Sequence, residues 1–329
     1  MITAGILGLG RWGRLLVGSV QGKSDHIRFA AGATRTPRKS RTFAKESGLE
    51  LCADYAELLA RPDIDVVFIA TPHSQHFGQI LEAAEAGKHV FCEKPFTLDP
   101  GDTKAALEAL GKAGLKAGVG FNRRFAPNTI ELKRMLDEGE LGKVVHIEAN
   151  FSNNMSQYTK AWRNSADESP AGGMTSLGMH AVDTFIHLLG PISNLTASSR
   201  NIAMPFDVDD STTMLMNFAA GPTGYLGTFA SSTLMWRVRL FGTEGWAELR
   251  DQDRMETLLA GGKSDARVWD GYAYPALATV AAGIEEFAKA VADDRAAPIS
   301  PDHIQHGIDV LGAIIASSRT NAMVSIMPA

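Results

Sequence analysis

The sequence lacks several features that would assign it to a specialised class of protein. Only two of its 329 residues are cysteine, Cys52 and Cys92, which gives no disulfide framework and suits a reducing compartment. It has no run of about 18 apolar residues that could cross a membrane, and we expect no signal peptide. Its net charge of -5 offers no basic field to nucleic acid. These absences favour a cytoplasmic enzyme or binding protein for small molecules, with no membrane or nucleic-acid partner.

The sequence also has no clustered metal ligands, repeats or low-complexity tracts. No group of Cys, His, Asp and Glu has the spacing of a zinc site, so we expect no metal. Hydrophobic residues make up 45% and charged residues 21% of the chain, which are ordinary values for a globular protein. At about 100–200 residues per domain, the length allows two domains.

The first motif that carries chemistry is a glycine-rich turn near the N-terminus. The apolar run Ile2–Leu7 predicts a strand, and apolar periodicity over 15–20 predicts a helix. Between them stands a G-x-G-x-x-G motif, in the setting that a dinucleotide site requires. Such glycines allow a tight turn, close approach to a pyrophosphate, and close packing of strand and helix. We therefore predict binding of a dinucleotide at the helix N-terminus by Gly8, Gly10, Arg11, Trp12 and Gly13.

The segment after the next predicted strand has no acidic side chain. An NAD-preferring fold places an acidic residue at the end of this strand, 27–34, to hold the ribose 2′-hydroxyl. Here Thr34 and Arg35 stand at that place, and residues 26–45 include six Lys or Arg and no Asp or Glu. Hydroxyl and guanidinium donors at Thr34, Arg35 and Arg38 suit an adenosine 2′-phosphate. We therefore favour NADP(H) over NAD(H). The alternative for Arg38, Lys39 and Arg41 is that they form a helix face exposed to solvent.

Strands and helices alternate over the first 121 residues, as a doubly wound parallel sheet requires. After the first two strands we expect strands at 49–52, 64–70, 88–92 and 116–121, and helices at 40–47, 54–60, 73–86 and 101–114. The alternation stops near residue 121. We therefore place a dinucleotide-binding domain at 1–121 and a second domain at 122–329.

Ligands of such a sheet lie beyond the carboxyl ends of its strands, where two polar groups stand. The residues TPH at 71–73 follow one buried strand, and EKP at 93–95 follow the next. Pro95 favours an extended backbone at Lys94, which aims the amine off the sheet edge; the alternative is a structural edge lysine. Near the nicotinamide we expect Thr71, Pro72, His73, His76 and Glu93. The two histidines fit exposure to solvent equally well.

The chain resembles the family of glucose-fructose oxidoreductase and inositol 2-dehydrogenase, the Gfo/Idh/MocA oxidoreductases. The resemblance is carried by GILGLGRWG at 5–13, DIDVVFIATPHSQH at 63–76, GKHVFCEKP at 87–95, GFNRRFAP at 120–127 and AGGMTSLGMHAVD at 171–183. The EKP segment is the most specific of these. The resemblance implies an α/β protein with a Rossmann domain, followed by an α/β domain with a large, mostly antiparallel open sheet. The other face of that sheet often forms the subunit interface, which implies a homodimer or homotetramer.

The second half of the sequence fits this implication. Strand-like segments follow one another at 143–152, 194–203, 211–218, 224–232, 236–242 and 246–250, and helical periodicity covers 124–138, 173–189, 276–292 and 303–321. We expect the helix at 276–292 to lie against the first domain. The polar stretch 153–170 predicts a loop over the substrate, where Trp162 and Arg163 contact it or serve only the fold.

Hydride transfer to or from nicotinamide needs a group that exchanges a proton with the substrate oxygen. The resemblance implies Lys94 for this role, supported by an Asp and a His four residues apart. His180 matches the histidine, although a packing histidine is the alternative when the resemblance is ignored. The aspartate position holds Ser176, which cannot act as a base at neutral pH. Asp183 either supplies a nearby carboxylate or makes a structural contact.

The expected function is therefore NADP(H)-dependent oxidation or reduction of a sugar, polyol or related hydroxy or keto compound. Lys94 would be the acid/base and His180 would polarise the substrate oxygen, while substrate binding would involve Asn122, Trp162, Arg163 and Ser176. One alternative is an NAD(P)-dependent dehydrogenase of a dihydrodiol or another non-sugar substrate. The other is a sensor or regulator that binds a dinucleotide without catalysis, which the missing aspartate supports.

Overall fold

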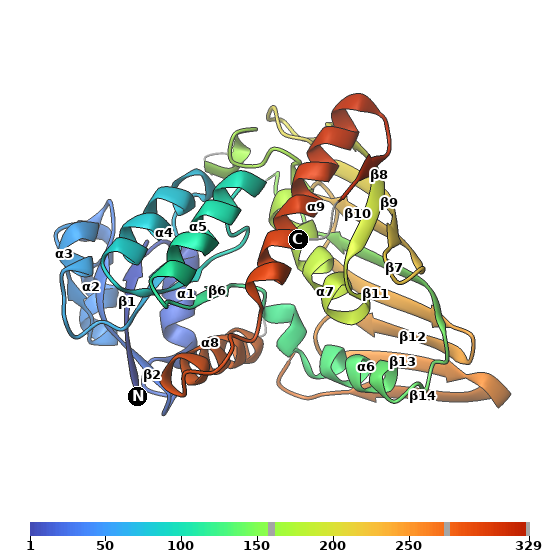
Figure 1. Cartoon of the computed structure of the whole chain (residues 1–329), viewed down its shortest axis with the longest axis horizontal. Helices are drawn as coiled ribbons and strands as arrows, with labels where there is room; N and C mark the ends of the chain where they lie inside the picture. Colours follow the sequence, from blue (N-terminus) through green and yellow to red (C-terminus); the bar gives the residue numbers. More distant parts are fainter. Residues whose placement is uncertain (157–161, 273–276, 327–329) are drawn as a thin grey trace. The chain divides into compact units, whose positions relative to one another are not determined.

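The computed structural model describes residues 1–156, 162–272 and 277–326, which form two compact units (Figure 1). The first unit consists of 1–121 and 277–304, and the second of 122–276 and 305–329. The first division of the chain thus follows Phe121. The range that we expected for the second domain, 122–329, includes a segment that packs within the first unit.

The first unit is built on a parallel sheet of six strands in the order β3-β2-β1-β4-β5-β6. The strands are β1 (Ile2–Leu7), β2 (Ile27–Ala33), β3 (Glu50–Leu51), β4 (Val66–Ile69), β5 (His89–Cys92) and β6 (Ala117–Val119). The strand order reverses direction between β1 and β4, and ligands of doubly wound folds bind at such a point. The predicted doubly wound fold is confirmed.

Helices cover both faces of this sheet. They are α1 (Arg11–Val20), α2 (Pro37–Ser47), α3 (Tyr55–Leu59), α4 (His76–Glu85), α5 (Pro100–Lys112) and α8 (Leu277–Ala292). Side chains of α1, α2 and α8 share one hydrophobic cluster with Ala4 and Ile6 of β1. Gly5, between those two residues, faces Leu58 of α3 on the opposite side. The sheet is therefore buried on both faces, which explains its nearly continuous apolar strands.

Two of these helices begin differently from the expectation. The helix expected at 40–47 begins at Pro37, because proline fits the first position of a helix, where its missing N–H costs nothing. The helix expected at 73–86 begins as the 3-10 turn η1 (His73–Gln75) and continues as α4. Asp54 caps α3, since its carboxylate accepts a hydrogen bond from the Glu57 N–H.

Helix α8 returns to the first unit because its apolar face completes the core of that unit. Phe287 is fully buried, and its ring centroid lies 5.5 Å from that of Phe91 on β5. The Phe91 ring stacks on Phe68 at 4.7 Å, and Phe68 meets Phe29 edge to face at 4.9 Å. The aromatic row therefore runs from β2 to α8.

The second unit contains a nine-stranded sheet in the order β14-β13-β12-β11-β7-β10-β9-β8-β15. Its strands are β7 (Val144–Ser152), β8 (Ile192–Arg200), β9 (Ser211–Phe218), β10 (Thr223–Phe229), β11 (Met235–Gly242), β12 (Gly245–Arg250), β13 (Arg254–Leu259), β14 (Lys263–Val268) and β15 (Val324–Ser325). The pair β7–β10 is parallel, and the other neighbouring strands are antiparallel. The expected, mostly antiparallel sheet is confirmed, but β13, β14 and β15 were not predicted.

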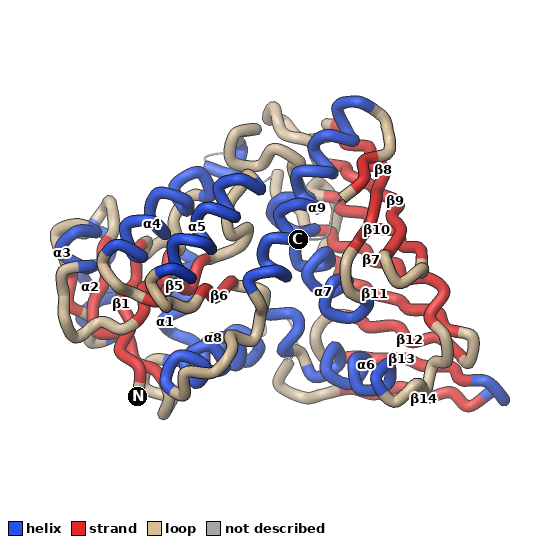
Figure 2. The backbone as a smooth tube through the Cα atoms, viewed as in Figure 1, coloured by secondary structure: helices blue, strands red, loops and turns tan. Residues whose placement is uncertain are grey.

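The longer helices of the second unit lie on one face of its sheet (Figure 2). They are α6 (Pro127–Asp137), α7 (Met179–Leu189) and α9 (Pro301–Thr320), of which residues 305–320 belong to this unit. The short turns are η2 (Asn122–Phe125), η3 (Trp162–Asn164), η4 (Met174–Gly178) and η5 (Ala260–Gly262). The helix expected at 124–138 is thus split into η2 and α6, and that expected at 173–189 into the π-helical η4 and α7. Across the described ranges, no helix has the length and hydropathy to cross a membrane.

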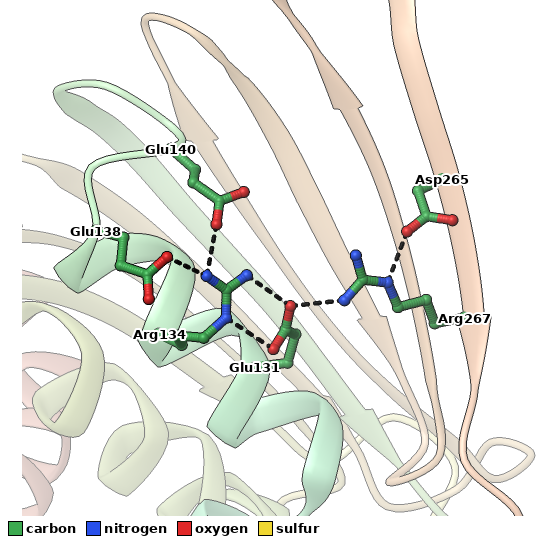
Figure 3. Close-up of polar contacts among 6 residues, drawn as sticks. All are labelled: Glu131, Arg134, Glu138, Glu140, Asp265 and Arg267. Atoms are coloured by element: carbon green, nitrogen blue, oxygen red, sulfur yellow. Dashed lines mark hydrogen bonds and ion pairs between the residues drawn. The ribbon is translucent and has the colours of Figure 1, made fainter.

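Strand β14 lies at the sheet edge, and a charged network ties it to α6 (Figure 3). Glu131 pairs with Arg134 on the same helix at 2.8 Å and with Arg267 on β14 at 2.7 Å. Arg267 also pairs with Asp265 at 2.6 Å, and Arg134 contacts Glu138 and Glu140. The hydrogen bond from Arg134, together with the nearby Arg267, lowers the pKa of Glu131. Because all six residues of β14 are exposed, these pairs replace the burial that fixes the inner strands.

Candidate active site

The three glycines of the N-terminal turn serve different physical purposes. Gly8 has a φ of +100°, and a Cβ there would lie 2.6 Å from the Ala70 oxygen. A Cβ on Gly13 would lie 1.9 Å from the Gly8 oxygen, so both positions require glycine for the fold itself. A Cβ on Gly10 would meet nothing within 4 Å, and Gly10 is exposed. The fold itself therefore does not require glycine at this position, and the lack of a side chain leaves space that a ligand could fill.

The N-terminus of α1 follows directly from this turn. Its N-cap is Gly10, which provides no side-chain hydrogen bond to the first turn. N–H groups at a helix start attract an anion, so this geometry fits the pyrophosphate of a dinucleotide. Arg11 is exposed beside the turn, whereas Trp12 is half-buried against the hydrophobic cluster. Trp12 therefore has a packing role in addition to any contact with a ligand.

The basic segment after β2 lies open to solvent. Thr34 is half-buried at the strand end, and Arg35 and Arg38 are exposed. The structure adds Arg14 from α1, which the sequence analysis did not select. Its Nη2 donates a hydrogen bond to the Lys39 oxygen at 2.7 Å. Several cationic side chains therefore lie near the end of β2.

At the carboxyl end of β4, Thr71 and His73 are held by the protein. The Thr71 hydroxyl lies 2.6 Å from Oε1 of Gln79 and donates to it, which leaves its lone pairs to accept hydrogen bonds. His73 is 3% exposed and His76 is 0% exposed, so the alternative that these histidines face solvent is wrong. Pro72 is half-buried between them and the strand. These residues therefore line the carboxyl edge of the sheet.

The EKP segment follows β5 at the same edge. Glu93 is buried, and a Cβ on Gly120 would lie 2.5 Å from its Oε1, so the carboxylate packs against the end of β6. The Glu93 N–H donates to the Ile69 oxygen at 2.9 Å, which ties this segment to β4. Lys94 is half-buried and precedes a cis peptide bond to Pro95.

In the second unit, His180 and Ser176 lie one turn apart on consecutive helices. Ser176 is in the π-helical η4, a rare turn that is frequent at functional sites, and His180 is the second residue of α7. They are 7% and 8% exposed, respectively. The Ser176 hydroxyl contacts Sδ of Met155 at 3.6 Å, and the His180 ring centroid lies 6.0 Å from that of Phe151. Both side chains are thus held in the helix-covered side of the sheet.

Asp183 forms a buried ion pair with Arg124 of η2. The Arg124 Nε lies 3.3 Å from Asp183 Oδ2, and Nη2 contacts Oδ1 more closely. The side chains are 6% and 0% exposed. Of the two expectations for Asp183, the structural contact is the one observed. The carboxylate joins α7 to η2 and is compensated by a guanidinium.

Two further side chains of η2 also make contacts within the second unit: Asn122 was expected to bind substrate, whereas Arg123 was named only as part of the family motif. The guanidinium of Arg123, 4% exposed, lies 4.4 Å from the Trp236 ring centroid and 4.9 Å from that of Phe151. Asn122 donates to Oε1 of Gln252 at 3.2 Å. The signal in the sequence was NRRF directly after a buried strand. It did not reveal that the two arginines use different anchors.

The predicted substrate loop, 153–170, is described except for residues 157–161. Trp162 and Arg163 are half-buried on η3, and the Arg163 guanidinium lies 4.1 Å from the Trp162 ring centroid. This stacking fixes the plane of the guanidinium while its edge keeps donors for hydrogen bonds.

Two models of protein families match the chain. Residues 2–121 match the oxidoreductase family GFO_IDH_MocA with its NAD-binding Rossmann fold, and residues 129–248 match the GFO/IDH/MocA C-terminal domain.

Curated relatives and solved structures agree with these matches. The scyllo-inositol 2-dehydrogenase (NAD(+)) of Bacillus subtilis is 33% identical over 264 residues, which cover 74% of this chain and 72% of that protein. An uncharacterized oxidoreductase, YrbE, of the same organism is 39% identical over 142 residues, but the match spans only 41% of its length. A levoglucosan dehydrogenase solved with NADH and levoglucosan superimposes with a TM-score of 0.91 at 22% identity, over 99% of both chains.

Proposed function

The chain belongs to the Gfo/Idh/MocA oxidoreductase family and is an NAD(P)-dependent oxidoreductase of CH–OH groups; from this premise, we propose that it oxidises or reduces a sugar or polyol with Lys94 as the acid/base. The observation that carries the proposal is the position of Lys94. It is the second residue after β5, at the carboxyl edge of the sheet, where doubly wound folds bind their ligands.

The first unit offers the parts that a dinucleotide needs. The open position at Gly10 and the start of α1 suit the pyrophosphate, and Thr71, Pro72 and His73 suit the nicotinamide end. The bound nucleotide would supply or accept the hydride. Lys94 would give a proton to the substrate oxygen during reduction, or take it during oxidation.

The second unit contributes groups that hold the substrate. His180 would donate a hydrogen bond to the substrate oxygen, and Ser176, Asn122, Trp162 and Arg163 would bind neighbouring hydroxyls. Because Asp183 is neutralised by Arg124, the proton is assigned to Lys94 rather than to a carboxylate of α7. Sugars and inositols are supported by the relatives, one of which is named for scyllo-inositol and another for levoglucosan.

We further propose that the cofactor is NADP(H). Thr34 at the end of β2 and the exposed Arg35 and Arg38 offer donors to a 2′-phosphate, and the segment holds no carboxylate to repel it. The relative from Bacillus subtilis is named for NAD(+), so the proposal of NADP(H) rests on the residues of this chain alone. Affinities for both nucleotides decide the point. Arg35→Ala should weaken the binding of NADP(H) about tenfold and leave the binding of NAD(H) unchanged. Equal affinities in the unaltered protein would refute the preference.

We also propose a homodimer or homotetramer that forms through the sheet face away from the helices. That face carries a charged cluster in which Glu248, 1% exposed, pairs with Arg239 and Arg250. Leu215 on β9, which is 64% exposed, lies on the same face and is separated from Glu248 by β10, β7 and β11. Light scattering should find an oligomer, and Leu215→Asp should shift it toward the monomer. A monomer at every concentration would contradict this.

The two free, buried cysteines suit the cytoplasm, which we propose as the location.

A nicotinamide absorbance assay against a panel of sugars, inositols and dihydrodiols tests the proposed chemistry. Turnover that disappears in Lys94→Ala would support a sugar or polyol oxidoreductase. Turnover only with dihydrodiols would favour the second substrate class. Tight binding of nucleotide with no turnover on any of these substrates would favour a sensor, for which Ser176 in place of an aspartate is the supporting observation.

A further inference from the structure

His76 is unusual because both of its ring nitrogens face carbonyl oxygens. Nδ1 lies 3.0 Å from the Pro95 oxygen and Nε2 lies 3.2 Å from the Thr71 oxygen, and the residue is fully buried. A carbonyl oxygen only accepts hydrogen bonds, whereas a neutral imidazole has one N–H and one lone pair. Both contacts are favourable only when each nitrogen carries a proton. The geometry therefore favours the imidazolium form.

Two other histidines of the chain show the opposite arrangement. The Lys116 N–H donates to Nδ1 of His89 at 3.0 Å, and the Ile192 N–H donates to Nε2 of His306 at 2.9 Å. A ring nitrogen that accepts a backbone N–H has no proton, so each of these rings is neutral. Burial also lowers the pKa of His89. His89 and His306 can therefore serve as internal references for neutral histidines when His76 is measured.

The two carbonyls that His76 joins belong to the two loops of the candidate site. Thr71 follows β4, and Pro95 follows Lys94 directly. On the other side of Lys94, the Glu93 N–H donates to the Ile69 oxygen at 2.9 Å. Lys94 therefore lies between two backbone positions that are tied to neighbouring segments. One of these ties is made by the His76 ring.

We propose that His76 is a protonated positioning residue whose imidazolium joins the loop after β4 to the EKP segment and thereby sets the geometry and charge of Lys94. The role assigned to Lys94 is that of the proposed function. A second positive charge held in this region disfavours the protonated amine, which helps Lys94 to give up its proton. The two carbonyls compensate the buried cation by accepting both of its hydrogens.

Other titratable groups surround this ring and must be separated from it in any measurement. The His73 ring centroid lies 5.8 Å from that of His76. The segments packed around α4 also carry Tyr55, Glu93, Lys94, Asp99 and Asp102. The test must therefore observe His76 and Lys94 individually rather than through activity alone.

The protonation of His76 can be observed in the full chain by NMR with ¹⁵N-labelled histidine. The His76 signals are assigned by their loss in His76→Gln. We expect two protonated nitrogens up to about pH 8, above the range in which an ordinary histidine loses its proton. His89 and His306 should each show one unprotonated nitrogen in the same spectrum. An unprotonated nitrogen at His76 near pH 7 would overturn the proposal.

The action on Lys94 can be read from the titration of ¹³Cε-labelled lysine, assigned with Lys94→Arg. In His76→Leu, the Lys94 midpoint should rise by about one pH unit, because a nearby cation has been removed. His76→Gln keeps one donor without the charge and should show the same rise with less loss of stability. His26→Leu, at an exposed histidine, is the control and should leave the midpoint unchanged. An unchanged midpoint in both His76 variants would refute the influence on Lys94.

Kinetics then separate this inference from the proposed function. In the active protein, His76→Gln should lower kcat about 10- to 100-fold, the scale of a misplaced acid/base group, while nucleotide affinity changes little. An unaltered kcat would exclude the positioning role. If the unaltered protein turns over no substrate while both NMR results are as expected, the proposed chemistry fails and the His76–Lys94 linkage stands.

Discussion

The two units hold their candidate site residues by different means. In the first unit, the loops after β4 and β5 are fixed by backbone groups: Glu93 N–H bonds to Ile69, and the His76 ring bonds to the Thr71 and Pro95 oxygens. In the second unit, side chains do this work, through the Arg124–Asp183 pair and the stacking of Arg123 on Trp236. The backbone bond between Glu93 and Ile69 tolerates changes of side chain nearby, whereas anchoring that depends on a side chain, as at His76 and in the second unit, fails when that side chain is lost.

The largest expected effect concerns the glycine turn of the first unit. Gly13→Ala should destabilise the fold by more than about 4 kcal/mol, because its Cβ would meet a backbone oxygen at 1.9 Å. Gly10→Ala should leave the melting temperature nearly unchanged but weaken nucleotide binding at least about tenfold, since the added Cβ meets no protein atom within 4 Å and enters the space proposed for the pyrophosphate. Thermal unfolding and nucleotide titration measure the two effects. Equal losses of stability in both variants would contradict the assignment of Gly10 to the ligand.

The buried pair of the second unit should follow in magnitude. Asp183→Asn leaves the Arg124 charge buried without its carboxylate, at a cost of about 3–5 kcal/mol in the free energy of unfolding. The double variant Arg124→Met/Asp183→Leu should recover much of this loss, since both charges are then absent. Urea denaturation of the two variants tests the comparison. A single variant as stable as the unaltered chain would show that this pair does not anchor α7.

The smallest effect is expected at the sheet edge, where Glu131 joins α6 to β14. Because the pKa of Glu131 is lowered in the folded protein, its ionised carboxylate stabilises the fold at pH values above the ordinary pKa of a glutamate, about 4.3. This stabilisation is lost as the pH falls through the lower pKa of the folded state. Glu131→Gln should cost about 1 kcal/mol at neutral pH and show less loss of stability in acid. Urea denaturation at several pH values measures both. An identical pH dependence in the two proteins would exclude this contribution.

The same contrast explains what could be predicted from the sequence. The elements of the first unit were found because each buried strand and amphipathic helix has a local signature, and the G-x-G-x-x-G and EKP motifs stand at strand ends. Strand β14 was missed because all its residues are exposed, so it has no alternating apolar pattern. The π-helical turn η4 also has no signal in the sequence that separates it from an α-helix.

Contacts between distant residues limited the prediction of the site. Asp183 lies 59 residues from Arg124, and no local pattern indicates their pairing. The sequence placed His76 near the sheet edge but left its exposure open. Only the structure brings its ring between the Thr71 and Pro95 oxygens, the second of which is 19 residues away. Residue types at strand ends were thus predictable, whereas their partners were not.

The most direct test of the account is the rate of hydride transfer in Lys94→Ala. The rate is measured in a single turnover by nicotinamide absorbance, beside a nucleotide titration of the same protein. We predict a loss of at least about 100-fold in rate with nucleotide affinity retained, because the proton exchange is removed and the nucleotide contacts remain. Lys104→Ala, at an exposed lysine of α5, is the matched control and should transfer hydride at the full rate. A full rate in Lys94→Ala would contradict the acid/base role of this lysine.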